Sequence, residues 1–189
     1  MSDPALESTR RRLTAKQADT VDRLGRAAVD LLTREGFAGI TVRRVAAEAG
    51  VGAATAYTYF SSKEHLVAEV FWRRLVNSPE VAHESGDAVT RVVEVLAHIA
   101  MLVAGEPEFA GAVTTALLGK DPDVEVLRQR IRRDIRGRLC AALGTDTDSD
   151  VVDSLEMLYA GALVRAGMGY GSYQEIAERL EKSARLILR

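Results

Sequence analysis

The stretch from Gly39 to Lys63, GITVRRVAAEAGVGAATAYTYFSSK, is the feature that most constrains the fold of this chain. Its apolar and small residues recur at three- and four-residue steps, which is typical of helices. The pattern is interrupted once, at Ala49-Gly50-Val51, where the glycine can adopt the left-handed backbone that a tight turn needs. We therefore predict a helix-turn-helix whose second helix runs from about Gly52 to Phe60.

Small side chains favour a close crossing of these two helices. The inner angle is predicted to hold Val45, Ala46, Ala49, Val51 and Ala56. The residues then turned outward on the second helix are Ala53, Ala54, Thr55, Thr58 and the pair Tyr57 and Tyr59. Tyrosine and threonine hydroxyls can donate to phosphates, and alanine and threonine methyl groups can contact thymine methyls. Such a helix fits the major groove of DNA.

The rest of the chain is helical in its periodicity and has no convincing alternating strand. A first helix is predicted to end at Gly36, and Ser62 to cap a helix that ends at Ser78-Pro79. Further helices are predicted at about 87–105, 107–119, 121–143 and 151–171, and a capping box at Ser172 and Glu175 opens the last one. The predicted fold class is all-α, with about nine helices.

Composition points to a soluble intracellular protein. The chain has 189 residues, of which 47% are hydrophobic and 28% charged. No apolar run reaches the roughly 20 residues that span a bilayer, and no signal peptide is visible. The single cysteine, Cys140, excludes an internal disulfide framework and fits a reduced cytoplasm. The chain has only three histidines in addition to this cysteine, so it has few residues that could bind a metal. We expect no metal and no cofactor.

Enzyme motifs are missing from the sequence. It has no glycine-rich phosphate loop, no Gly-x-Ser-x-Gly and no His-Glu-x-x-His. Cys140 lies among Leu139, Ala141 and Ala142, a setting typical of a buried small residue rather than a nucleophile. Residues 1–76 hold 12 Lys/Arg against 9 Asp/Glu, a modest basic excess that weakly favours a polyanionic partner. We predict a protein that is not an enzyme.

At these residues the chain resembles the tetracycline-repressor (TetR) family of bacterial transcription regulators. A helix of about 15 residues is followed by Gly-Phe, then by TVRRVAAEAGV and TAYTYFSSKEHL, so the resemblance covers about residues 19–76. It implies a helix-turn-helix DNA-binding domain at 19–76 and an effector-binding and dimerisation domain at 77–189. Residues 1–18 would form a flexible basic arm. Its Arg10-Arg11-Arg12 run is expected either to enter the minor groove or to remain a solvated tail.

The resemblance also implies roles for single residues. Thr41 matches a phosphate contact, and it is also simply a helix cap. Arg43 matches a position that often reads a base edge, commonly guanine, while Arg44 is expected to meet phosphate or solvent. Phosphate-clamp positions fall on Thr55, Tyr57 and Lys63. As alternatives, Tyr57 is a partly buried core ring and Lys63 a solvated helix start, although a cation there opposes the helix dipole.

This chain departs from the family pattern at the start of the recognition helix. Many relatives carry a polar or basic residue where Gly52, Ala53 and Ala54 stand here, so direct base readout from that end is in doubt. Specificity is then expected from Arg43, Thr58, Tyr59 and methyl contacts, or from DNA shape. The complete predicted DNA-binding set is Thr41, Arg43, Arg44, Gly52, Ala53, Thr55, Tyr57, Thr58, Tyr59 and Lys63.

A homodimer is implied by the resemblance and required if two recognition helices meet a palindrome. The two last helices are the predicted interface. Small residues there permit close helix approach, at Ala160, Gly161, Ala162, Ala166, Gly167 and Gly169. Apolar area is expected from Leu180, Ile187 and Leu188. Packing of these residues within one subunit is the alternative.

An effector pocket is expected between the long helices of the central region. The predicted lining is His98, Met101, Leu102, Phe109, Val113, Leu117, Met157, Tyr159 and Arg165. An aliphatic lining suits a hydrophobic molecule, and His98 or Arg165 would orient an anionic or carbonyl group. Each apolar member also fits plain core.

The resulting hypothesis is a dimeric repressor in the bacterial cytoplasm, released from a palindromic double-stranded DNA operator by a small hydrophobic effector, with no membrane partner. One alternative is an activator or a ligand-independent DNA-binding regulator. The other is a helical interaction module whose helix-turn-helix binds protein.

Overall fold

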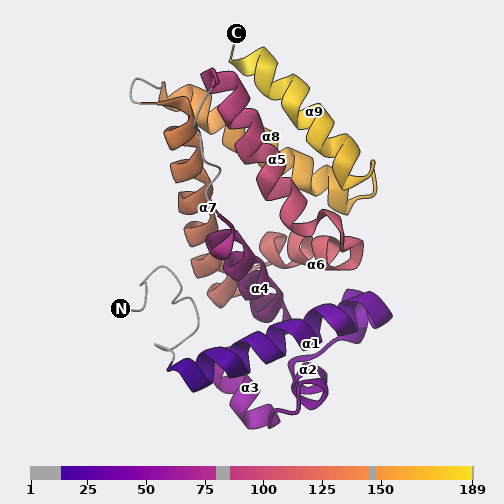
Figure 1. Ribbon diagram of the computed structural model, residues 1–189. Helices are drawn as coiled ribbons and strands as arrows, with labels where there is room; N and C mark the ends of the chain where they lie inside the picture. The colour runs from indigo at the N-terminus through magenta and orange to yellow at the C-terminus, as the bar shows by residue number, and fades with distance from the viewer. Residues whose placement is uncertain (1–13, 80–85, 145–147, 189) are drawn as a thin grey trace. The chain divides into compact units, whose positions relative to one another are not determined.

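The computed structural model describes residues 14–79, 86–144 and 148–188, and in these ranges it contains nine α-helices and no strand (Figure 1). The all-α prediction is therefore confirmed. The described chain divides into two compact units. The first comprises the residues up to Asn77 together with Glu106–Gln129, and the second comprises Ser78–Gly105 and the residues from Arg130 on.

Helix α1 (Ala15–Gly39) opens the first unit. Thr14 caps it in a capping box with Gln17, in which the Thr14 amide donates to the Gln17 side chain at 2.8 Å. Residues 15–18 are therefore helical, which corrects the prediction of a flexible arm through residue 18. The Arg10-Arg11-Arg12 run lies outside the described residues.

Gly36 breaks the helical geometry of α1, as its position in the sequence predicts. Its backbone has φ 68° and ψ 174°, a combination that residues with a side chain avoid. The helix continues past this kink to Gly39, and Ile40 follows, fully buried.

The core of the first unit forms where α1 meets α2 (Val42–Glu48), α4 (Lys63–Asn77) and α6 (Pro107–Leu118), and α4 packs in turn on α6. Its largest fully buried side chains are Leu24, Leu32, Ile40, Phe60, Leu66, Phe71, Leu75 and Phe109. Burying a side chain of this size stabilises the fold by about 1.5–3 kcal/mol. Helix α2 thus packs against a core of large, fully buried side chains.

Helix α6 belongs to this first unit, although the sequence suggested a boundary after residue 76. Two contacts of Arg74 in α4 account for its position. The guanidinium is 4.3 Å from the centre of the Phe109 ring, and it pairs with the Glu106 carboxylate at the start of α6. The first turns of α7 (Pro122–Leu143) join the same unit.

The second unit contains α5 (Ala88–Ala104), the remainder of α7, α8 (Ser149–Gly167) and α9 (Tyr173–Ile187). Helix α9 packs against both α5 and α8 (Figure 1). The predicted capping box of Ser172 with Glu175 is confirmed, and the structure adds a cap at Asp87, whose side chain accepts from the Thr90 amide. These local signals define where the helices begin.

Several predictions about the second unit were wrong. Helix α8 ends at Gly167 rather than near Gly171. Leu180 and Ala166 are buried in a cluster with Ala100 and Ile176, so they do not supply a surface for a partner. Cys140 is exposed on α7, although its apolar sequence neighbours favoured burial.

Within the described ranges, no single helix is both long and apolar enough to cross a bilayer. Only α5 and α6 taken together, across a break, reach the required length and hydropathy.

Candidate nucleic-acid interface

Helices α2 (Val42–Glu48) and α3 (Ala53–Tyr59) form the predicted helix-turn-helix. Gly50 at the turn has φ 63°, the left-handed conformation expected from the sequence. The Val51 amide donates to the Ala46 carbonyl at 2.8 Å and closes the turn. Val45, Ala46 and Ala56 are buried between the two helices, which confirms their predicted place in the inner angle.

Arg23 of α1 holds this turn from outside the motif. One of its guanidinium nitrogens, Nη2, donates to the Ala49 carbonyl at 2.6 Å and lies 3.3 Å from the Gly50 carbonyl. The bond ties the helix-turn-helix to α1 across 26 residues of sequence. No local pattern signals such a contact, and sequence reasoning missed it.

Thr41 caps α2, as predicted. Its backbone is extended, with φ −140° and ψ 156°, and its Oγ1 accepts from the Arg44 amide at 3.2 Å. The residue is exposed, so the hydroxyl and the helix N-terminus face solvent. A phosphate contact by Thr41 stays a prediction.

The two neighbouring arginines of α2 differ in the contacts that their guanidinium groups make. Arg43 is exposed, and its guanidinium has no hydrogen-bond or ion-pair partner among the described residues. Arg44 instead donates to the Glu35 carboxylate at 2.6 Å and to the Gly39 carbonyl at 2.8 Å. The Arg44 guanidinium thus binds the end of α1 while 52% of the side chain stays exposed, and its contact with phosphate or solvent stays a prediction. Of these two arginines, only Arg43 has a guanidinium without a partner among the described residues.

The outward face of α3 is uncharged. Its exposed residues are Ala54, Thr55, Tyr57 and Thr58, with Gly52 exposed just before the helix and Ala53 partly buried. Tyr57 is 47% exposed, which favours the outward position over the core alternative. The Thr58 hydroxyl donates to the Thr55 carbonyl of its own helix at 2.6 Å.

Tyr59 was predicted to face outward with Tyr57, and this prediction was wrong. Only 5% of its surface is exposed. It stands three residues after the buried Ala56, a spacing that places both on the same helix face. The ring lies 6.4 Å from that of Phe60, the next residue in the core. Tyr59 therefore supports α3 from behind.

Lys63, predicted as a phosphate clamp, makes contacts within the protein. Its Nζ donates to the Phe37 carbonyl at 2.7 Å and lies 4.3 Å from the centre of the Phe37 ring. These contacts explain a cation at the start of α4, where it opposes the helix dipole. A phosphate contact by Lys63 stays a prediction.

Two serines before and at the cap of α4 are tied to the start of α7. The Ser62 hydroxyl donates to Asp121 at 2.6 Å, and the Ser61 hydroxyl donates to Asp123 at 2.5 Å. Partial burial raises the pKa of Asp121, but the hydrogen bonds from Ser62 and from two backbone amides outweigh it, so the pKa lies below its ordinary value. The buried His65 ring lies beside this pair, its Nδ1 3.8 Å from Asp123.

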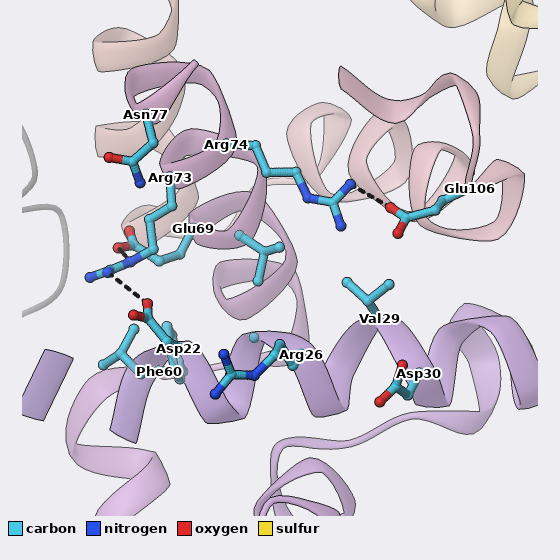
Figure 2. A pocket seen from close by; sticks show the side chains of 13 residues that line it. Asp22, Arg26, Val29, Asp30, Phe60, Glu69, Arg73, Arg74, Asn77 and Glu106 are labelled. Carbon is cyan, nitrogen blue, oxygen red and sulfur yellow. Dashed lines mark hydrogen bonds and ion pairs between the residues drawn. The ribbon is translucent and has the colours of Figure 1, made fainter. Parts of the chain in front are cut away.

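A groove of about 560 Å³ lies between α1 and α4 in the same unit (Figure 2). The fully buried Glu69 accepts from Arg73 at 2.8 Å, and Arg73 also reaches Asp22 at 3.3 Å. Gly25 keeps the two helices close, because a Cβ there would lie 3.2 Å from Val70. None of the predicted effector residues lines this groove.

The predicted effector residues fall in both units. Phe109 and Val113 are buried and Leu117 is partly buried, all on α6 of the first unit. In the second unit Tyr159 is buried, and the buried Nε2 of His98 has no hydrogen-bond partner among the described residues.

Three members of this set are on the surface of the second unit. Met101 and Met157 are 56% and 69% exposed. Arg165 is exposed too, and its guanidinium lies 5.6 Å from the centre of the Tyr170 ring. These three side chains thus face outward in the single chain, and their part in effector binding stays a prediction. Among the described residues, no group of three His, Cys, Asp or Glu side chains is placed to hold a metal ion.

This arrangement, two short helices on a glycine turn with an exposed cation and an uncharged outward helix face, defines a DNA-binding regulator of the helix-turn-helix class. The family profile described as "Bacterial regulatory proteins, tetR family" matches residues 25–70. Proteins of Mycobacterium tuberculosis and Mycobacterium bovis, both named as uncharacterized HTH-type transcriptional regulators, are 43% identical over 189 residues, which is 99% of this chain and 88% of theirs. The chain belongs to the TetR family of bacterial transcription regulators, and the function of that family is regulation of transcription, not enzyme catalysis.

Solved structures agree with this fold. A TetR transcriptional regulator from Rhodococcus sp. RHA1 has a TM-score of 0.71 and 22% identity, covering 88% of this chain and 96% of that one. A transcriptional repressor from Thermus thermophilus, solved in complex with lauroyl-CoA, has a TM-score of 0.57 and 24% identity, covering 89% of this chain and 93% of that one. At this level of identity the likeness concerns the fold.

Proposed function

We propose that this chain is a dimeric repressor that binds a palindromic operator in the bacterial cytoplasm and leaves it when a small hydrophobic effector binds. The observation that carries the proposal is the exposed Arg43, which has no partner among the described residues, beside the exposed face of α3. One such set reads one half-site, and two copies of the chain read a palindrome whose half-sites are about 34 Å apart or a multiple of that distance.

The dimer is supported by an apolar stripe on α8. Ala160 and Gly161 are exposed three and four residues after the exposed Met157, and Met168 is exposed seven residues after Gly161 at the end of the helix, with Met157 and Met168 at 69% and 63%. Leu186 of α9 is also 61% exposed. Small residues beside large apolar ones permit two helices to pack closely across a two-fold axis. The proposed interface therefore consists of these exposed residues and leaves out Leu180 and Ala166, which are buried.

The effector is proposed to bind in the second unit, near His98. The buried Nε2 of this residue has no hydrogen-bond partner in the part of the chain that the structure describes, and a buried polar atom in this state costs free energy until something bonds to it. A ligand with an apolar body and a polar group at one end would satisfy it. The neighbour from Thermus thermophilus was solved with lauroyl-CoA, which joins an apolar acyl chain to a polar CoA group.

The effector proposal is tested by titrating laurate and lauroyl-CoA into the complex of the full chain with its selected operator. Fluorescence anisotropy of the labelled DNA reports release. A coupling of 1–3 kcal/mol corresponds to a loss of operator affinity of about 5- to 150-fold. His98→Asn is expected to weaken this response and to leave operator affinity without effector unchanged. If saturating amounts of both probes leave the complex intact, a hydrophobic effector of this class is excluded.

The sign of regulation is tested with a reporter whose promoter overlaps the selected operator. A repressor lowers reporter output when the chain is expressed, and Arg43→Ala restores it. Higher output with the chain present would identify an activator instead.

A further inference from the structure

The outward face of α3 has a chemistry that limits which bases it can recognise. The helix reads AATAYTY and contains no charged residue and no side-chain amide. The pairings that read a base with two hydrogen bonds use Arg or Lys on guanine, or Asn or Gln on adenine. Helix α3 offers none of these.

Two residues stand at the centre of this face. Ala54 and Thr58 are one helical turn apart, opposite the buried Ala56 and Tyr59. Both side chains are exposed. When α3 lies in the major groove, these two residues face the base edges.

The Thr58 hydroxyl already donates its hydrogen bond within the protein. It donates to the Thr55 carbonyl at 2.6 Å, within α3 itself. What Thr58 offers to DNA is therefore its methyl group and an acceptor oxygen, and what Ala54 offers is a methyl group alone. The C5 methyl of thymine is the apolar group that a base pair presents in the major groove.

Resting on the proposed operator binding, we propose that Ala54 and Thr58 recognise thymine by contact with its methyl group, so that each half-site contains thymines under α3 beside the guanine read by Arg43. Tyr57, exposed to one side of this face, contacts the backbone phosphates that hold the helix in register. The specificity of α3 is then apolar, and Arg43 of α2 supplies the directional polar contact.

Deoxyuridine tests this directly, because it lacks only the methyl group of thymine. A palindrome is first selected from random duplexes with the full chain, and its thymines are then replaced by deoxyuridine at one symmetric pair of positions at a time. Loss of one buried methyl contact lowers affinity about fourfold, and loss in both half-sites about 15-fold. We expect this loss at one or two pairs of positions and less than about twofold elsewhere.

A protein variant assigns the contact to its residue. Thr58→Ser removes the side-chain methyl and keeps the hydroxyl, so the ratio of affinities for thymine and deoxyuridine should fall to near one at the position that Thr58 contacts. Thr33→Ser is the matched control. Thr33 is an exposed residue of α1, and its hydroxyl likewise donates to a carbonyl of its own helix, that of Val29 at 3.0 Å. It should leave every ratio unchanged. Ala54→Gly tests the second position, with the same ratio as readout.

The outcomes separate the two proposals. If a palindrome is selected and its fully deoxyuridine-substituted form binds as tightly, methyl recognition is overturned and operator binding stands. Sensitivity to deoxyuridine that persists in both Thr58→Ser and Ala54→Gly overturns the assignment to α3. If no sequence is selected at all, the proposed function fails and this inference fails with it.

Discussion

Two adjacent arginines of α2 make a matched pair for testing how this protein reads DNA. Arg43 has no partner among the described residues, whereas Arg44 is bound to Glu35 and to the Gly39 carbonyl. The same substitution at each position therefore removes different interactions. Arg43→Ala removes a charge that we propose contacts DNA, and Arg44→Ala removes a contact that holds α2 to the end of α1.

The expected magnitudes differ accordingly. A guanidinium on guanine is worth about 1–3 kcal/mol of discrimination, and a dimer on a palindrome makes the contact twice. Arg43→Ala should thus weaken operator binding about 30-fold or more and random-duplex binding only a few-fold. Arg44 and Glu35 form a pair with side chains 52% and 28% exposed, so losing it costs about 0.5–1 kcal/mol of stability. For a chain of this size that lowers the Tm by about 1–4 °C.

Both variants are assayed by anisotropy on the selected operator and a scrambled duplex, and by thermal unfolding. Arg43→Ala should lose preference for the operator at an unchanged Tm, and Arg44→Ala should lower the Tm with the preference kept. Equal loss on both duplexes from Arg43→Ala would make that residue a phosphate contact and would refute the base-reading role. A Tm lowered as much by Arg43→Ala as by Arg44→Ala would show that Arg43 has a structural partner.

Three further predictions follow from single contacts. Arg23→Met keeps the aliphatic part of the side chain but loses the hydrogen bond to the Ala49 carbonyl. The free energy of unfolding should therefore fall by about 1–2 kcal/mol, and operator affinity should fall too. An unchanged Tm would show that the turn needs no support from α1. Trp72, the single tryptophan and 4% exposed, should emit at short wavelength and resist acrylamide quenching until the chain unfolds; ready quenching in the native protein would contradict its burial. The lowered pKa of Asp121 means that its ionised form stabilises the fold above about pH 4 and that this contribution is lost as the pH falls through the folded-state pKa. Asp121→Asn should therefore lower the free energy of unfolding at pH 7, and the difference from the parent protein should shrink as the pH falls through the folded-state pKa, as measured by urea unfolding. A difference that stays constant with pH would exclude a contribution from this charge.

Local sequence signals predicted the fold well. Caps at Thr41, Ser62 and Ser172 mark the starts of α2, α4 and α9, because a cap bonds to amides two or three residues away and is visible in a short window. Gly50 likewise predicted its own turn, since the left-handed backbone is a property of that residue alone.

Contacts between distant segments could not be predicted in this way. Arg44 pairs with Glu35 and Lys63 with the Phe37 carbonyl, while Tyr59 turns inward because α3 rotates to bury Ala56. Each depends on how a helix is rotated against α1, and periodicity leaves this undetermined when alanines are present on every side. The predicted effector set includes buried and exposed residues for a related reason, since an apolar residue on a helix fits a core, a cavity wall or a partner surface equally well.

The central claim is that this chain is a sequence-specific DNA-binding dimer, and selection of bound duplexes from a random library by the full chain tests it most directly. We expect enrichment of one palindrome, two chains bound per duplex, and an affinity that falls steeply with salt as phosphate contacts release counterions. A selection that enriches no sequence, even at low salt, would contradict the account and would favour a helix-turn-helix that binds protein.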